Sequence, residues 1–350
     1  MRKHVLEFSS NKERAKALGL KPAPVIKGYF LGKEKTERIL GANSARGKRK
    51  YPWLYIETIE ECNLKCWFCY SYSGRKITGR RISLEDMKMA VDALNEHGLE
   101  TVIVAGRGEP LLDENLFPLI EYVTNKGLWF VLFTNNTLIK PEIASELYSV
   151  NTSVIAKLGS LDACKQDSIV GMEGAHVAIR KGLNLLLEAG FREPRLAVDI
   201  TITKRTMDEM EHIWRYLRQR HIVPYLEPLI ESGRALENPD KLEKERLSSE
   251  AIGGLFQRLR EIDEHEFGYT WVINRKIRTP GAEECTKNKT ALTLRQSGDI
   301  GTCINDLELV VGNIFHNDLI DIIKNSPTLK KLRLDRTPCQ CKYCGVRIEK

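Results

Sequence analysis

The sequence predicts an α/β fold built on a parallel β-sheet. From residue 51 onward, six apolar segments of strand length alternate with amphipathic segments of helix length. This alternation is typical of β-α units with right-handed crossovers, arranged as an open doubly wound sheet or as a partial barrel. The chain of 350 residues, 42% of them hydrophobic, is long enough for one large core and a small additional module. In either arrangement, chemistry is expected at the carboxyl ends of the strands.

Each expected element follows from its own pattern. The first helix has Leu84, Met87, Val91 and Leu94 on one face, with Ser83 as its N-cap. The expected strands are Leu54–Thr58, Thr101–Ala105, Trp129–Thr134, Ser153–Ala156, Leu196–Thr203 and Val223–Glu227. The expected helices are Leu84–Asn95, Leu116–Asn125, Pro141–Tyr148, Ala175–Ala189 and Met207–Gln219.

Composition divides the chain into four segments. Residues 1–50 form a basic extension with 14 Lys or Arg and 4 Glu. Its surplus of positive charge, 14 − 4 = 10, exceeds the net charge of +7 of the whole chain. Residues 51–236 hold the alternating elements, residues 237–270 form a charged helical linker, and residues 271–350 form a C-terminal module. The extension either attracts nucleic acid, a phosphorylated substrate or an acidic partner, or is a solvated surface with few aromatics for base stacking.

Hydropathy and cysteine usage argue against a membrane-spanning protein and against a secreted, disulfide-bonded protein. No apolar run approaches the ~18 residues of a membrane span, and residues 1–10 lack the apolar region of a signal peptide. We therefore expect a cytoplasmic protein with no membrane partner. Nine cysteines in a chain of this kind indicate metal or redox chemistry, because cytosolic thiols stay reduced.

Three of these cysteines, Cys62, Cys66 and Cys69, follow the first strand with the spacing C-x3-C-x2-C. A structural zinc site takes four protein ligands, whereas a cubane iron–sulfur cluster held by three thiolates keeps one iron open. The alternatives are a zinc loop or three reduced core thiols. With Phe68 directly before the third cysteine, the motif resembles the signature of the radical S-adenosylmethionine (radical SAM) superfamily.

The resemblance implies the fold, the cofactors and the reaction type. In that family the three thiolates hold a [4Fe–4S] cluster whose open iron binds SAM, and reductive cleavage gives a 5'-deoxyadenosyl radical that abstracts a hydrogen atom. It implies a partial (β/α)6 radical SAM barrel over residues 51–236, with a flavodoxin- or ferredoxin-type reductant as partner. Such chemistry belongs to the cofactors, and the protein supplies orientation and excludes water.

Two further turns resemble motifs of the family. The run from Gly106 to Pro110 is similar to its GGEP motif, with Arg107 in place of a Gly, and Thr134 to Leu138 is similar to its TNG turn, with Asn136 in place of Gly. Asn tolerates left-handed backbone, so that turn can survive. Together with strand-end positions, the resemblance gives a set of expected SAM contacts: Phe68, Gly108, Glu109, Pro110, Ser160, Asp199 and Thr201.

Other polar residues near strand ends have open assignments. Asp199, Thr201 and Thr203 share one strand face, which either points to the interior or is covered by helices. Lys157 is expected either to bind a substrate carboxylate or phosphate or to be solvated, and Glu227 is a candidate substrate ligand. Cys164 is either a hydrogen-atom donor to a substrate radical or an inert buried thiol.

The C-terminal module carries a second cysteine set. Cys285, Gly298 and Cys303 have a spacing that resembles the opening of SPASM/twitch auxiliary-cluster modules, with hairpin strands expected at residues 290–295 and 299–303 and a helix at 320–332. The resemblance implies one auxiliary [4Fe–4S] cluster, with a structural zinc site as the alternative. Its expected ligands are Cys285, Cys303, Cys341 and Cys344, with Cys339 as a substitute for Cys341.

The sequence therefore predicts a radical SAM oxidoreductase that abstracts hydrogen from an unactivated C–H bond. The expected substrate is a small metabolite, such as a sugar or aminocyclitol, or a peptide, and the auxiliary cluster is expected to accept or relay an electron. One alternative is an RNA- or nucleotide-modifying radical SAM enzyme that uses residues 1–50 to bind phosphates. The other is a non-catalytic zinc-binding protein.

Overall fold

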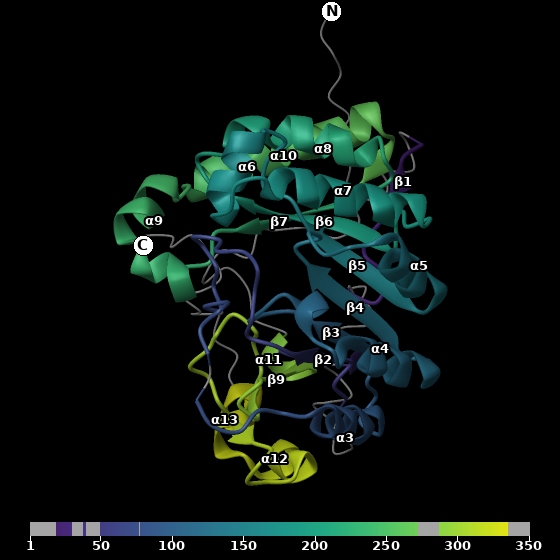
Figure 1. The fold of residues 1–350 in the computed structure, drawn as a ribbon, viewed down its shortest axis with the longest axis vertical. Coiled ribbons are helices and arrows are strands. Elements are labelled where there is room, and N and C mark those ends of the chain that lie inside the picture. Colours follow the sequence, from purple (N-terminus) through teal and green to yellow (C-terminus); the bar gives the residue numbers. More distant parts are fainter. Residues whose placement is uncertain (1–18, 30–37, 40–49, 77, 272–286, 335–350) are drawn as a thin grey trace, which may run out of the picture.

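The computed structural model describes residues 19–29, 38–39, 50–76, 78–271 and 287–334, and its centre is a nine-stranded sheet (Figure 1). The sheet has the strand order β11-β10-β9-β2-β3-β4-β5-β6-β7. The six consecutive strands from β2 to β7 are parallel, which confirms the predicted succession of β-α units. They are β2 (Trp53–Ile56), β3 (Thr101–Val104), β4 (Trp129–Thr134), β5 (Thr152–Lys157), β6 (Leu196–Ile202) and β7 (Val223–Pro228).

Helices cover the outer face of this sheet, as Figure 1 shows. Alternate strand residues such as Leu54, Ile56 and Val102 join the apolar stripes of these helices in the larger core. The predicted helices are present, and α6 was not predicted. The helices are α3 (Leu84–Asn95), α4 (Leu116–Asn125), α5 (Pro141–Ser149), α6 (Ala163–Val170), α7 (Ala175–Glu188), α8 (Met210–Arg218), α9 (Pro239–Glu245) and α10 (Ser249–Glu266). Single 3-10 turns are η1 (Pro110–Leu112), η2 (Met207–Glu209) and η3 (Gly233–Glu237).

The N-terminal segment 19–29 lies against the inner face of the sheet. The Gly28 carbonyl accepts a hydrogen bond from Thr101 Oγ1 at 2.8 Å, and the Lys27 carbonyl accepts one from Ser153 Oγ at 2.9 Å. Tyr29 belongs to the smaller core of this face. Earlier in the same segment, β1 (Lys21–Pro22) pairs in parallel with β8 (Tyr269–Thr270). Part of the basic extension is therefore built into the core.

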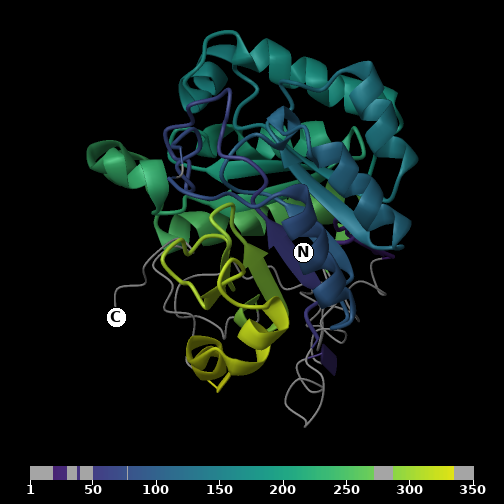
Figure 2. The same ribbon diagram turned by 60° about the horizontal axis from the view of Figure 1, so that its bottom comes forward.

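The C-terminal hairpin continues the same sheet. Strand β9 (Ala291–Leu294) runs parallel to β2, and β10 (Asp299–Gly301) and β11 (Gly312–Asn313) add antiparallel strands beyond it. Figure 2 shows these elements, drawn in yellow-green, beside the purple β2 arrow. The hairpin was predicted, but its pairing with β2 was not.

The predicted helix at 320–332 is two helices, α12 (Leu319–Asn325) and α13 (Pro327–Leu334). The prediction of one helix was wrong because of Pro327, which has no N–H to donate and disfavours helical backbone at the residue before it. Ser326 accordingly has ψ of 119° and ends the first helix.

Candidate active site

One cavity collects the strand-end residues that the sequence singled out. It lies at the carboxyl ends of the parallel strands, where open α/β sheets and barrels place their sites. Of the expected cluster, SAM and substrate residues, the lining contains Cys62, Cys66, Phe68, Cys69, Gly108, Glu109, Lys157, Asp199, Thr201 and Glu227. Asp199 and Thr201 therefore lie on the strand face that points to the interior, which was one of the two expected arrangements. Thr203 is buried outside the lining, and its backbone N–H donates to Thr206 Oγ1 at 3.1 Å.

The cysteine loop is fastened to neighbouring elements. Asn63 Nδ2 donates to Thr137 Oγ1 at 2.7 Å, and the Lys65 N–H donates to the carbonyl of Val170, the last residue of α6, at 2.9 Å. Gly171 has φ of +65°, and a Cβ there would lie 2.8 Å from the Lys65 carbonyl oxygen. The loop is thus held by the β4 turn on one side and by the end of α6 on another.

The three thiols suit a cationic iron cluster. Burial raises the pKa of Cys62 to about 11 and that of Cys66 to about 12, so both anions need a positive group beside them. Burial has the same effect on Cys69, but hydrogen bonds from Ser73 and Ser71 outweigh it and lower the pKa of that thiol. Within the described residues, no group of three or more His, Cys, Asp or Glu side chains is arranged to hold a metal ion.

Glu109 is a buried carboxylate that receives neutral hydrogen bonds. Its oxygens accept from Thr134 Oγ1 at 2.6 Å, from the Asn135 N–H at 2.8 Å and from the Leu111 N–H at 3.2 Å. Burial raises its pKa to about 7 despite these bonds. A Cβ on Gly108 would lie 2.3 Å from the Glu61 carbonyl oxygen, so only Gly allows this approach. The arrangement fits a cationic amino group.

The turn after β4 has the geometry that the sequence predicted. Asn136 is fully buried with φ of +66°, the left-handed region that Asn tolerates. A Cβ on Gly182 of α7 would lie 2.0 Å from the Asn136 carbonyl oxygen, so helix and turn are in backbone contact. The turn is therefore fixed, and with it the Asn135 N–H that binds Glu109.

A charged pair lies across the same cavity. Lys157 of β5 forms an ion pair with Asp199 of β6, whose side chain is fully buried while that of Lys157 is 40% exposed. Burial raises the pKa of Asp199 to about 7, and the Lys157 ammonium opposes this rise. Glu227 of β7 accepts a hydrogen bond from the Tyr225 hydroxyl at 2.7 Å. When both carboxylates are ionised, Lys157, Asp199 and Glu227 together carry one net negative charge.

Apart from Phe68, the sequence did not reveal the aromatic part of the lining. Tyr29, Tyr55, Tyr70 and Phe133 all line the cavity. The Tyr29 ring packs edge-on against Phe133 and against Tyr225, each at 5.6 Å between centroids. No local motif marks Tyr29, which lies 196 residues before its partner Tyr225. Only the fold brings it to the site.

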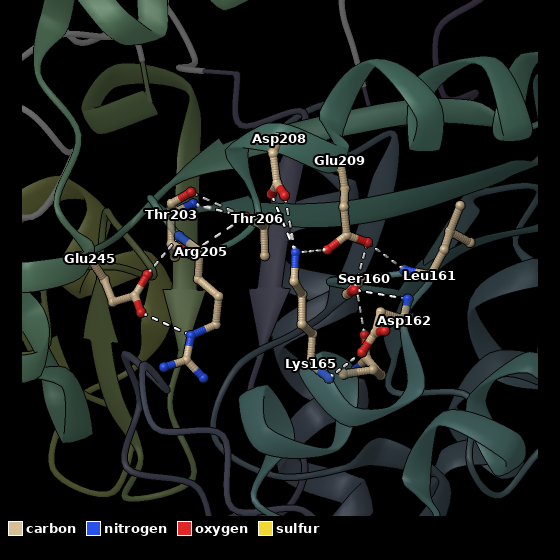
Figure 3. Close-up of polar contacts among 11 residues, drawn as sticks. Ser160, Leu161, Asp162, Lys165, Thr203, Arg205, Thr206, Asp208, Glu209 and Glu245 are labelled. Carbon is tan, nitrogen blue, oxygen red and sulfur yellow. Dashed lines mark hydrogen bonds and ion pairs between the residues drawn. The ribbon is translucent and has the colours of Figure 1, made fainter.

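Two of the expected SAM contacts, Pro110 and Ser160, and the candidate hydrogen-atom donor Cys164 lie outside this lining. Pro110 is buried at the start of η1, and Cys164 is exposed near the start of α6, rather than buried as an inert core thiol would be. Ser160 is fully buried, and its hydroxyl donates to Glu209 Oε2 at 2.7 Å and accepts from the Asp162 N–H at 3.0 Å. Figure 3 shows this contact, with the ammonium of Lys165 beside Asp208 and Glu209. The roles predicted for these residues stay predictions.

Of the expected auxiliary ligands, the structure describes Cys303, which follows β10. The loop after it reaches the cavity through Ile304 and Asn305. The buried Arg295 holds this loop by donating to the carbonyls of Leu307 at 3.0 Å and Leu309 at 3.2 Å. The other expected ligands lie outside the described residues: Cys285, Cys339, Cys341 and Cys344.

Comparison with known proteins gives relatives along most of the chain. An AdoMet-dependent heme synthase of Methanosarcina barkeri is 25% identical over 295 residues, which cover 78% of this chain and 82% of that protein. The mycofactocin maturase MftC of Mycolicibacterium smegmatis is 24% identical over 293 residues, covering 81% and 73%. The crystal structure of Streptococcus suis SuiB bound to its precursor peptide SuiA has a TM-score of 0.68 at 15% identity, covering 99% of this chain and 79% of that one, and shows a shared fold.

Two family models match the chain where the two cysteine sets lie. The Radical SAM superfamily model matches residues 56–217, and the SPASM model, an iron–sulfur cluster-binding domain, matches residues 285–345. The second match decides against the zinc alternative for the C-terminal module. Within the described residues, no helix is both long and apolar enough to span a membrane. The chain belongs to the radical SAM superfamily, as an enzyme that binds SAM at a [4Fe–4S] cluster and carries a C-terminal SPASM domain for auxiliary iron–sulfur chemistry.

Proposed function

We propose that this enzyme is an oxidoreductase that takes a hydrogen atom from an unactivated C–H bond of a peptide. The observation that carries the proposal is the single cavity shared by the three cysteines, Glu109 and the charged residues of β5 to β7. The names of one relative, a maturase, and of the SuiB structure with its precursor peptide support a peptide in preference to a sugar or aminocyclitol.

The cysteine end of the cavity is the proposed cofactor end. Cys62, Cys66 and Cys69 would hold the cluster, and Glu109 would accept hydrogen bonds from the amino group of SAM. When bound, these cofactors supply the 5'-deoxyadenosyl radical, and the auxiliary cluster accepts or relays the electron that the oxidised substrate gives up. Because the Glu109 carboxylate is already oriented by Thr134 and Asn135, it needs little rearrangement to receive an ammonium group.

The β5 to β7 side is the proposed substrate end. Lys157 is partly exposed into the cavity and can bind a peptide carboxylate or backbone carbonyl, while Asp199 holds the ammonium in place. Glu227 can accept a hydrogen bond from a substrate N–H with the oxygen that Tyr225 does not bind. Rings such as Tyr29 exclude water from this end, which protects a radical from side reactions.

A second candidate substrate is a tetrapyrrole. It is favoured by the heme synthase relative and by the Lys157 ammonium, since tetrapyrrole side chains carry carboxylates. A flavodoxin or ferredoxin is the proposed reductant in both cases.

The test uses the anaerobically reconstituted full-length enzyme with SAM and dithionite. Synthetic peptides deuterated at Cα and Cβ are compared with iron coproporphyrin III, a tetrapyrrole that the name of another relative contains, deuterated in its carboxylate-bearing side chains. Deuterium in the released 5'-deoxyadenosine, measured by mass spectrometry, identifies the hydrogen donor. Transfer from peptides supports the proposal, and transfer from the porphyrin alone contradicts it. A Cys66→Ala variant, which lacks one cluster ligand, should release no 5'-deoxyadenosine.

RNA binding that falls steeply with salt and requires residues 1–50 would favour the nucleic-acid alternative.

A further inference from the structure

Arg234 contacts the cysteine loop through three of its hydrogen-bond donors. Its Nη1 donates to the Cys66 carbonyl at 2.8 Å, its Nη2 to the Ser73 carbonyl, and its backbone N–H to the Cys69 carbonyl at 2.8 Å. Two of these three carbonyls belong to cluster cysteines. Arg234 comes from η3, about 160 residues later in the chain, so this is a tertiary contact that closes the loop on the side of β7.

The neighbouring backbone shows that the contact is tight. Gly233 has φ of +59°, and a Cβ there would lie 2.3 Å from the Tyr70 carbonyl oxygen and 2.5 Å from that of Cys69. Any residue other than Gly would push η3 away from the loop. The close approach of Gly233 fixes the backbone of Arg234. The planar guanidinium of Arg234 then donates to carbonyls at both ends of the loop segment from Cys66 to Ser73.

The charge of Arg234 has no carboxylate partner among the described residues. Its guanidinium donates to neutral carbonyls, and none of the ion pairs in the described part of the chain includes it. It is half-buried, so solvent screens it less than it screens a surface charge. Reduction adds one negative charge to a cluster, and a fixed positive charge beside the ligand loop stabilises the reduced form more than the oxidised form.

We propose that Arg234 is a positioning residue for the SAM-binding cluster, one that fixes the backbone of the cysteine loop and raises the cluster's reduction potential. The two effects separate by substitution. Gln removes the charge and the fork, whereas Lys keeps the charge but has only one nitrogen, which cannot reach both carbonyls at once.

The test follows the reduced cluster of the full-length, reconstituted enzyme by electron paramagnetic resonance, using the signal that changes when SAM is added. For Arg234→Gln, we expect the ratio of reduced to oxidised cluster at a fixed potential to fall about tenfold, or about 59 mV for one electron. For Arg234→Lys, we expect this ratio to stay within about twofold of the wild type. Both variants should lose iron from this cluster to a chelator faster than the wild type.

Arg75→Gln is the matched control. Arg75 lies in the same region, but its side chain is 62% exposed and pairs with Glu237, without a contact to the cysteine carbonyls. We expect this variant to keep the wild-type potential and iron retention. An equal shift in Arg75→Gln, or wild-type behaviour in Arg234→Gln, would overturn the proposal. If Arg234→Gln does not fold, wild-type iron retention in Arg234→Lys overturns the positioning role.

Discussion

Two buried carboxylates line one cavity and are held in opposite ways. Among the described residues, Glu109 accepts hydrogen bonds from neutral donors, whereas Asp199 faces the ammonium of Lys157. Burial raises the pKa of both groups to about 7. The charge of Asp199 is therefore balanced within the protein, while the charge of Glu109 is left for a cation that arrives from outside.

Asp199 and Lys157 thus form a complete ion pair within the protein, whereas Glu109, within the part of the chain that the structure describes, has no cationic partner until a ligand supplies one. A buried anion with neutral donors alone is costly, and it becomes favourable when a cationic ligand binds. The amino group of SAM would play that part at Glu109. Asp199 instead orients Lys157, whose exposed ammonium can meet a substrate. The predictions below test this contrast, from the largest expected effect to the smallest.

Gly108→Ala should have the largest effect, because it disturbs the backbone that carries Glu109. The new Cβ would lie 2.3 Å from the Glu61 carbonyl oxygen and 2.6 Å from that of Ile59, and neither backbone atom can move easily. We expect the free energy of unfolding to fall by about 3 kcal/mol, measured by urea denaturation. The control is Gly253→Ala in α10, where a Cβ meets nothing within 4 Å and Ala favours the helix. Equal stability of the two variants would contradict the prediction.

Glu109→Gln should weaken SAM binding by about 100-fold, or about 2.7 kcal/mol, because it removes the uncompensated charge. Equilibrium dialysis of labelled SAM against the reconstituted enzyme measures this. Glu142→Gln, at an exposed position of α5, is the control with the same chemical change. Asp199→Asn should weaken SAM binding less than Glu109→Gln. The reverse order would mean that the two carboxylates have been assigned the wrong way round.

Lys157→Met should lower the free energy of unfolding at pH 8 by about 2 kcal/mol, since it leaves Asp199 buried without its ammonium. This expected loss is smaller than for a fully buried ion pair, because solvent screens the Lys157 ammonium, whose side chain is 40% exposed. The double variant Lys157→Met/Asp199→Asn should recover most of the loss, because no buried charge then remains unpaired. If the double variant is no more stable than Lys157→Met, the pair does not act as proposed.

Much of this fold could be predicted from local patterns. Strands and helices follow from apolar periodicity, and the strand-end positions of Cys62, Glu109 and Lys157 follow from the order of those elements. The division at Ser326 was missed because the apolar pattern continues through Pro327, although the proline itself was a visible signal.

The remaining contacts depend on residues far apart in the chain. Tyr29 meets Tyr225, β9 pairs with β2, and Ser160 donates to Glu209. None of these pairs leaves a periodic or spaced signal in one sequence, because each partner fits its own element equally well without the other. The SAM contact predicted for Ser160 shows the consequence, since its hydroxyl already has a carboxylate partner outside the cavity lining.

The pH dependence of SAM binding should give the smallest effect. With a pKa of about 7, Glu109 is ionised in about one molecule in 11 at pH 6 and in about ten in 11 at pH 8. If the ionised form binds the SAM amino group, the Kd should rise about tenfold from pH 8 to pH 6 at constant ionic strength. Glu109→Gln should show no such dependence, and a wild-type Kd that stays flat would contradict the assignment.

Stability should change in the opposite direction over the same range. The folded pKa of Glu109 lies above its ordinary value of 4.5, so between these values the folded state binds more protons than the unfolded state. Its contribution to stability is therefore greatest below pH 4.5 and is lost as the pH rises through about 7. Acidification should strengthen the fold at this carboxylate while it weakens SAM binding, and Glu109→Gln should remove both effects. Burial also raises the pKa of Asp199, so the comparison is best made in the Lys157→Met/Asp199→Asn background, which lacks that carboxylate.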